Sequence, residues 1–288
     1  MAENSRKKVT LKRLAEKKAR GEKIVGMEVH ETPSAIMADE IGFDVLCCGS
    51  PGPMGLFGHE SMADVDFEEQ LYMLQAVVRG AQYAFVLCNM PNTTASISVE
   101  RAVENAARIA HLGADGIHLE PSMATLPAIE AITGAGVPVL GHFGVQGERS
   151  VMSSGYAPRG GDAADAVAIV RLARACVDAG IVAALCEHTA EEVTKYLWET
   201  LPVPVLSLGS GAYCDGIFHV SVDVAGISAF PTPPKRESFA DVWGVTKSAY
   251  QEYYDRAKAG TYPKPANSHH MYESEHERFL EQLAELVT

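Results

Sequence analysis

Glu187 is the first candidate for acid–base chemistry in this chain. It directly follows the apolar run VAALC, so we expect its carboxylate at the end of a buried strand. Partial removal from water raises a carboxyl pKa towards the range that suits a general base. A charge at a helix N-terminus, favoured by the helix dipole, fits the spacing equally well.

Histidine and glutamate side chains follow three other apolar runs. His118 and Glu120 are two residues apart, which places both on one side of a strand, and Glu28 and His30 share this spacing. His142 stands in a Gly-His-Phe-Gly stretch, where small neighbours let an imidazole approach a ligand. Each could bind a ligand or a metal through mixed nitrogen and oxygen donors, but the spacing matches no recognised metal motif. Hydrogen-bonded pairs inside a fold are the structural alternative.

Three smaller polar residues end apolar runs in the same way. Ser50 and Asn89 follow the second and third runs, and Ser210 lies between two glycines after the seventh. Glycine-rich turns at this place often contact anions, although an ordinary tight turn is the commoner interpretation.

Short apolar runs alternate with longer amphipathic segments along the chain. The candidate strands are Ile24–Val29, Val45–Cys48, Ala84–Cys88, Gly116–Leu119, Val137–Leu140, Val182–Cys186, Val203–Leu208 and Val220–Ala225. Candidate helices between and around them include Ser98–Leu112, Asp162–Ala179, Ala190–Thr200 and Phe239–Ala259. Eight strand–helix units predict a parallel (β/α)8 TIM barrel, whose working residues gather at the carboxyl ends of the strands.

The two ends of the chain add helices to this barrel. Leu11–Arg20 reads as an amphipathic helix that closes the bottom, and Glu273–Leu286 as a final helix in a polar tail. We therefore predict a catalytic barrel over residues 1–264 and a tail over residues 265–288 that contacts another subunit of an oligomer.

Charge and composition exclude several classes of protein. The chain has 24 Lys and Arg against 37 Asp and Glu, a net charge of −13, which argues against binding to nucleic acid or to an anionic membrane surface. No apolar stretch is long enough to span a membrane, and the basic N-terminus lacks the apolar core of a signal peptide. Six cysteines without a CxxC pair are typical of reduced thiols, so we expect a cytoplasmic protein.

Taken together, these residues resemble the ketopantoate hydroxymethyltransferase family of the phosphoenolpyruvate/pyruvate barrel superfamily. The resemblance extends from about Leu11 to Tyr262 and rests on the order and spacing of many short landmarks. They include Ala38-Asp39-Glu40, Gly58-His59-Glu60-Ser61, Arg79-Gly80-Ala81, Met90-Pro91, Glu104-Asn105-Ala106, Gly141-His142, Gly155-Tyr156, Asp215-Gly216 and Tyr262-Pro263.

The resemblance implies an aldol-type reaction. In the family a 2-oxo acid chelates Mg²⁺, a glutamate removes the C3 proton, and the enolate attacks the one-carbon unit of 5,10-methylenetetrahydrofolate. Glu187 matches the family's base, Glu120 the glutamate beside the metal, and His142 the active-site histidine.

Three departures from the family pattern change this expectation. The two aspartates that bind the metal are replaced by Ser50 and Asn89, and the lysine that pairs with the substrate carboxylate is replaced by His118. Mg²⁺ prefers carboxylate oxygens, so its affinity should fall steeply. Glu28 and His30 are candidates for a relocated metal site.

Several functions remain open at this stage. We expect enolate-forming C–C bond chemistry on a small 2-oxo acid, with Glu187 as base and His118 and His142 stabilising the enolate. Ser50, Asn89, His118 and Ser210 are candidates for binding the substrate. The alternative is a lyase, hydrolase or decarboxylase of the same superfamily acting on another carbonyl compound. A non-catalytic relative is the third and weakest alternative.

Overall fold

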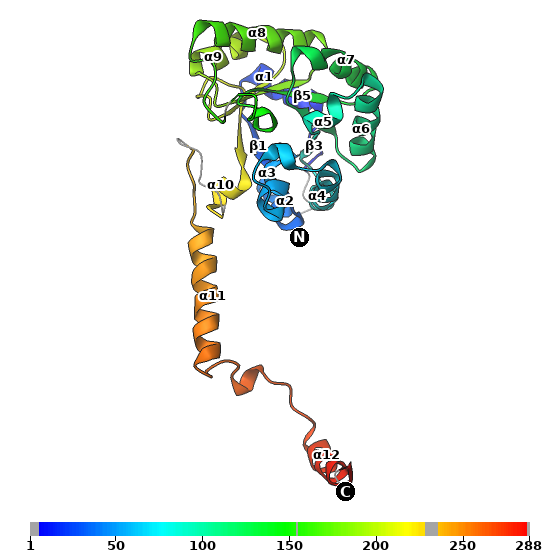
Figure 1. Cartoon of the computed structure of the whole chain (residues 1–288), viewed down its shortest axis with the longest axis vertical. Coiled ribbons are helices and arrows are strands. Elements are labelled where there is room, and N and C mark those ends of the chain that lie inside the picture. Colours follow the sequence, from blue (N-terminus) through cyan, green and yellow to red (C-terminus); the bar gives the residue numbers. More distant parts are fainter. Residues whose placement is uncertain (1–5, 154, 228–235, 287–288) are drawn as a thin grey trace. The chain divides into compact units, whose positions relative to one another are not determined.

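Eight parallel strands close into a barrel in the computed structural model, which describes residues 6–153, 155–227 and 236–286 (Figure 1). The strands are β1 Ile24–Glu28, β2 Val45–Cys48, β3 Phe85–Asn89, β4 Gly116–Leu119, β5 Val139–Gly144, β6 Ala183–Glu187, β7 Val205–Leu208 and β8 Gly216–Val220. Neighbours along the chain pair with each other, and β8 pairs with β1 to complete the ring. The predicted (β/α)8 barrel is confirmed.

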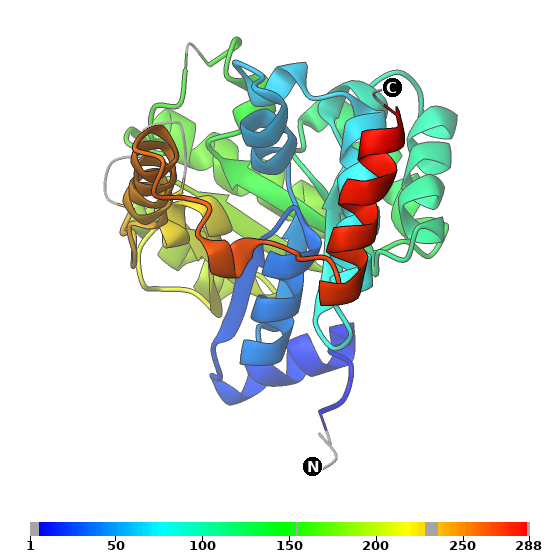
Figure 2. The ribbon, with the colours of Figure 1, turned by 90° about the horizontal axis from the view of Figure 1, so that it is seen from below.

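Helices surround this barrel (Figures 1 and 2). In the barrel unit they are α1 Leu11–Arg20, α2 Thr32–Ile41, α3 Pro51–Phe57, α4 Phe67–Gly80, α5 Asn92–Ala95, α6 Val99–His111, α7 Leu126–Gly134, α8 Ala163–Asp178, α9 Glu191–Thr200 and α10 Ser221–Ala225. Short 3-10 turns cover Met62–Asp64, Met123–Thr125 and Gly147–Arg149. Apolar side chains on the outside of the strands pack against the helices, as in other barrels of this kind.

The predicted eighth strand was wrong. Val220–Ala225 is mostly helix α10, which ends at Gly226 with a left-handed φ of 64°, and the strand lies earlier, over Gly216–Val220. Its outward residue Ile217 is 44% exposed and His219 interrupts the apolar run, so the sequence signal was weak. A Cβ at Gly216 would overlap the backbone of Ile24, so the glycine is what allows β8 to approach β1.

Alternation along the strands places the polar residues inside the barrel mouth. Interior positions at the amino ends of the strands are apolar and form one cluster with Val9 and Leu14. Helix α1, which carries Leu14, therefore closes the bottom of the barrel as predicted. Further along β1, β3, β4, β5 and β6, the same inward direction is taken by Glu28, Asn89, His118, His142 and Glu187.

The chain divides into two compact units, Met1–Ala240 and Asp241–Thr288. The second contains α11 Val242–Lys258, a 3-10 turn over Pro265–Asn267, and α12 Glu273–Leu286. This division falls before α11, whereas the sequence suggested a boundary at residue 264. Among the described residues, no helix is both long and apolar enough to cross a membrane.

Candidate active site at the barrel mouth

Four inward-facing side chains form a continuous line across the mouth. Glu187 Oε2 lies 3.1 Å from His142 Nε2, at ion-pair distance but without the alignment of a hydrogen bond. His142 Nδ1 lies 3.0 Å from His118 Nε2, and His118 Nδ1 lies 2.8 Å from Asn89 Oδ1. The sequence predicted all four as site residues, and the barrel brings them into direct contact.

The amide of Asn89 sets the direction of this line. Its Nδ2 donates to Glu148 Oε1 at 2.6 Å and to Ser50 Oγ at 2.7 Å, so its Oδ1 faces His118. A carbonyl oxygen only accepts, so His118 Nδ1 carries a proton and its Nε2 accepts one from His142 Nδ1. The remaining nitrogen of His142, Nε2, is the one that faces the carboxylate of Glu187.

Charge separates the roles of the two histidines. Burial, reinforced by the charge of His142, lowers the pKa of His118 to about 3, so this ring is neutral at physiological pH. Burial also disfavours the charged form of His142, but Glu187 outweighs it and raises the pKa of His142. Of the two rings, His142 is therefore the one that takes up a second proton more readily, next to Glu187.

The expected rise in the Glu187 pKa was wrong. Burial does raise it, but the interaction with His142, followed by the charge of Arg236, overcomes that effect and lowers the pKa. The groups that compensate for burial come from distant parts of the chain, so the sequence next to Glu187 does not reveal them. Glu187 is therefore ionised at neutral pH, the state that a proton acceptor requires.

Glu148 is the centre of a second network at the mouth. Its Oε1 accepts from Ser50 Oγ at 3.0 Å and from Asn89 Nδ2, and its Oε2 accepts from the backbone of Asn92 at 2.6 Å. Its own backbone N–H donates to Glu120 Oε2 at 3.2 Å. Burial and the neighbouring charge of Glu148 raise the pKa of Glu120 to about 8. Glu120, Ser50 and Asn89 thus belong to one buried acidic cluster.

Arg236 holds the outer oxygen of Glu187. Its Nη2 donates to Glu187 Oε1, and its Nη1 lies 2.8 Å from Asp223 Oδ2. The Arg236 side chain is only 7% exposed, and Asp223 is equally buried. Arg236 therefore links Glu187, at the end of β6, to Asp223 on α10.

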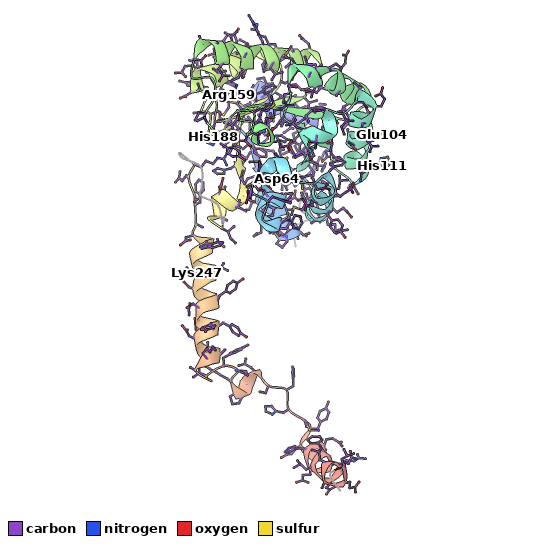
Figure 3. The ribbon with its side chains drawn as sticks, in the orientation of Figure 1. Asp64, Glu104, His111, Arg159, His188 and Lys247 are labelled. Carbon is purple, nitrogen blue, oxygen red and sulfur yellow. The ribbon has the colours of Figure 1, made fainter. Side chains whose placement is uncertain are left out.

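The backbone around Glu187 is tightly constrained. His188 has a φ of 42°, a left-handed conformation that is costly for a residue with a side chain. A Cβ at Gly144, at the end of β5, would overlap the carbonyl of Glu187 and the side chain of Thr189. Figure 3 shows His188 close to Arg159, whose backbone N–H donates to the His188 carbonyl at 2.9 Å. Strain and close approach together fix the end of β6.

Glu28 and His30 form a separate pair at the end of β1. His30 Nδ1 lies 3.3 Å from Glu28 Oε1, and Ser221 Oγ donates to the other oxygen at 3.4 Å. Burial lowers the pKa of His30, but Glu28 reverses this and the pKa is raised. The pair is buried and satisfied internally, and its role as a relocated metal site stays a prediction.

Ser210 uses its hydroxyl on the backbone. Its Oγ donates to the carbonyl of Cys186 at 2.8 Å and accepts from the N–H of Thr189 at 2.9 Å. These bonds join the loops after β6 and β7. Among the contacts of the described residues, none links Ser210 to the line of Glu187, His142 and His118, so substrate binding by Ser210 stays a prediction.

The donor set does not fit the Mg²⁺ site that the resemblance implies. At the two aspartate positions, Ser50 and Asn89 donate hydrogen bonds to Glu148 instead of offering oxygen ligands. The side-chain oxygen of Asn89 accepts a hydrogen bond from His118. Mg²⁺ requires near-octahedral oxygen ligands, usually with carboxylates among them. In residues 6–153, 155–227 and 236–286, no group of three or more His, Cys, Asp or Glu side chains is arranged to hold an ion.

Sequence reasoning missed Glu148, Arg236 and Asp223. Glu148 follows β5 by four residues, in the loop region where barrel enzymes place working residues, so a search of all such loops would have found it. Arg236 lies sixteen positions after β8, in a proline-rich stretch with no spacing to mark it.

Solved structures of related barrels share the fold. Phosphonopyruvate hydrolase in complex with oxalate and Mg²⁺ matches with a TM-score of 0.59 and 13% identity, covering 96% of this chain and 97% of that chain. Oxaloacetate acetylhydrolase in complex with 3,3-difluorooxalacetate matches with a TM-score of 0.59 and 14% identity, covering 90% of each chain. At this identity the likeness establishes the fold alone.

Sequence relatives are closer. A curated 3-methyl-2-oxobutanoate hydroxymethyltransferase from Moorella thermoacetica is 33% identical over 269 residues, covering 93% of this chain and 99% of the relative. One from Emericella nidulans is 31% identical over 288 residues, covering 98% of this chain and 82% of the relative. The family model for ketopantoate hydroxymethyltransferase matches residues 8–265. The chain therefore belongs to the ketopantoate hydroxymethyltransferase family, a family of transferase enzymes.

Proposed function

We propose that this protein forms an enolate from a small 2-oxo acid and uses it in C–C bond chemistry. By family, the substrate is 3-methyl-2-oxobutanoate and the one-carbon donor is 5,10-methylenetetrahydrofolate. The proposal rests on the 3.1 Å contact at the barrel mouth between the carboxylate of Glu187, whose pKa is lowered, and the ring of His142, whose pKa is raised.

Glu187 is the proton acceptor in this mechanism. The C3–H bond of the 2-oxo acid breaks, the proton moves to the carboxylate, and the electron pair forms the C2–C3 double bond of the enolate. The negative charge then lies on the C2 oxygen. A carboxylate that is ionised at neutral pH and held at the end of a strand is suited to this step.

His142 compensates the charge that develops on the enolate oxygen. Its Nδ1 proton is directed to His118, so the proton on Nε2 is the one available at the mouth. Neutral His118 accepts without adding a second positive charge. A preorganised donor in a site that excludes water stabilises an oxyanion more than water does.

Cleavage of a C–C bond is the second candidate function. The residues around Glu148 differ from the family pattern, and this difference favours it. The positions of the family's metal-binding aspartates carry Ser50 and Asn89, which donate to Glu148. The same base and imidazolium would serve a retro-aldol step, in which the leaving enolate is stabilised in the same way. Supplying the hydroxymethylated 2-oxo acid and measuring release of the one-carbon unit distinguishes this direction.

The test is hydrogen exchange at C3 of 3-methyl-2-oxobutanoate in D₂O, followed by NMR. We expect exchange by the wild type in EDTA and a loss of about 10²–10⁴-fold in Glu187→Gln, the usual contribution of a general base. Glu130→Gln, on α7, is the control and should exchange normally. Exchange only after addition of Mg²⁺, Zn²⁺ or Co²⁺ would show that other ligands recruit a metal. Absence of exchange under every condition would refute this 2-oxo acid as substrate.

We also propose that the protein is a cytoplasmic homo-oligomer. Support comes from α12 of the second unit, where Phe279, Leu280, Leu283 and Leu286 form an exposed apolar face. Such faces usually pack against another chain. Light scattering should give a mass larger than that of one chain for the wild type and a smaller mass for Leu283→Glu. Equal masses for the two proteins would argue against this contact.

A further inference from the structure

Arg236 has hydrogen-bonding capacity that its neighbours do not use. Its two terminal nitrogens contact Glu187 and Asp223, but its buried Nε has no partner in the part of the chain that the structure describes. Buried donors without a partner are rare because the lost contact with water is costly. A ligand that accepts a hydrogen bond would satisfy this atom.

A second unpartnered nitrogen belongs to the residue after Glu187. Nε2 of His188 is buried and, in the described residues, forms no hydrogen bond. Burial, together with the charge of Arg236, lowers the pKa of His188, so the ring is neutral and close enough to feel that charge. Together with Nε2 of His142, three nitrogens without a hydrogen bond to the described residues therefore lie around the proposed base, and one of them belongs to a cation.

A 2-oxo acid whose C3 lies at Glu187 also brings a carboxylate close to this residue. The carboxylate carbon of a 2-oxo acid is two bonds from C3, so a base that reaches C3 is also close to the carboxylate. By the resemblance, His118 takes the place of the family lysine that pairs with this carboxylate, and its ring is neutral. Arg236 contacts Glu187 directly, and its planar fork matches a carboxylate in bidentate geometry.

We propose that Arg236 binds the carboxylate of the 2-oxo acid and, in doing so, releases Glu187 to act as base. This inference rests on the function proposed above. Without substrate, the guanidinium is shared between Glu187 and Asp223, and the substrate carboxylate competes with Glu187 for it. Loss of that contact removes one of the interactions that hold the Glu187 pKa down. Glu187 therefore becomes a stronger base only when a carboxylate-bearing substrate is present.

Calorimetric binding tests the anchor independently of turnover. The probes are 3-methyl-2-oxobutanoate, oxalate, and 3-methyl-2-butanone, which lacks the carboxylate. We expect Arg236→Gln to raise Kd for both acids by about 10–100-fold, as for loss of a charge-assisted bidentate contact, and to leave the ketone unaffected. Arg236→Lys keeps the charge but lacks Nε and the fork, so it should recover only part of the affinity.

Two other arginines supply matched controls. Arg101→Gln removes an exposed charge on α6 that is paired with Glu104 and should bind both acids normally. Arg149 also has an unpartnered Nε in the described residues, but it contacts Asn92 rather than Glu187. A larger loss of oxalate affinity in Arg149→Gln than in Arg236→Gln would overturn the proposal, as would a Kd for Arg236→Gln within twofold of the wild type.

The pH profile of C3 exchange tests the release of Glu187. In Arg236→Gln, the acid limb of kcat/KM should move to higher pH, because the pKa of Glu187 rises in the free enzyme. An acid limb at the same pH as in the wild type would refute the release of Glu187 by the substrate. Circular dichroism checks that each variant folds. If Arg236→Gln does not fold, the measurements on Arg236→Lys test the proposal in its place. Wild type that binds oxalate through Arg236 without exchanging C3 would refute the proposed function and retain the anchor. Wild type that binds neither acid would refute the anchor.

Discussion

His118 and His142 share a single hydrogen bond, with His118 Nε2 3.0 Å from His142 Nδ1 and ring centroids 4.9 Å apart. Only one proton fits between two such nitrogens. The Asn89 carbonyl oxygen on the far side of His118 decides which ring donates it. His142 is therefore the donor, and its other nitrogen, Nε2, faces the carboxylate of Glu187, the proposed base.

Nitrogen NMR should detect this arrangement. In protein labelled with ¹⁵N-histidine, we expect His118 as the neutral Nδ1–H form from pH 5 to pH 8, because its pKa is lowered to about 3. Asn89→Ala removes the acceptor for Nδ1–H and should mix the two neutral forms. A His118 ring that titrates near pH 6.5 in the wild type would contradict the assignment.

Folding stability should depend on pH through His142. Its folded pKa is raised above the ordinary value of 6.5, so its contribution is fully present below that value and is lost as pH rises through the folded pKa. Glu187 has a lowered pKa, so its contribution is present above 4.5 and is lost as pH falls through the folded pKa.

Urea unfolding from pH 6 to pH 9 measures the histidine part. The free energy of unfolding should fall with increasing pH more steeply in the wild type than in His142→Gln. His111→Gln, an exposed histidine on α6, is the control and should follow the wild type. Parallel curves for wild type and His142→Gln would show that the pair does not stabilise the fold.

Restoring carboxylates should restore metal binding. The double variant Ser50→Asp/Asn89→Asp places oxygen ligands at both family positions, and Glu148→Gln in the same chain removes the repulsion from Glu148. We expect this triple variant to bind Mg²⁺ at least about 10-fold more tightly than the wild type, since Mg²⁺ sites depend on carboxylates. Calorimetry measures this, and Glu148→Gln alone is the control. Equal affinity in all three proteins would show that the mouth lacks the required geometry.

Gly144 should be essential for positioning Glu187. In Gly144→Ala the new Cβ would overlap the Glu187 carbonyl at a φ of 90°, so the end of β6 must shift. A displacement of about 1 Å at a reacting group costs roughly 10²-fold in rate.

Gly134→Ala is the matched control for this substitution. Gly134 lies at the end of α7, and a Cβ there meets no atom within 4 Å. It should keep full activity and gain up to about 1 kcal/mol of stability, measured by thermal unfolding. Normal C3 exchange in Gly144→Ala would show that the glycine does not position the base.

Strand positions were predicted well where both faces are buried. β2 and β4 match the predicted bounds, because short apolar runs between helices leave little choice of structure. β8 was misplaced because it carries an exposed isoleucine and a histidine, and because its place depends on Gly216 meeting β1. That contact joins residues nearly 200 positions apart and leaves no local signal.

The barrel, the family and the residues at the strand ends could all be predicted from the sequence, since periodicity and short motifs are local properties. Glu187, His118, His142 and Asn89 could be named from their places after apolar runs. How these residues act on one another depends on the folded arrangement. The direction of the proton line, the lowered pKa of Glu187 and its contact with Arg236 arise from groups on different strands and loops. Electrostatic interactions depend on distance in space, which the order of residues along the chain does not contain.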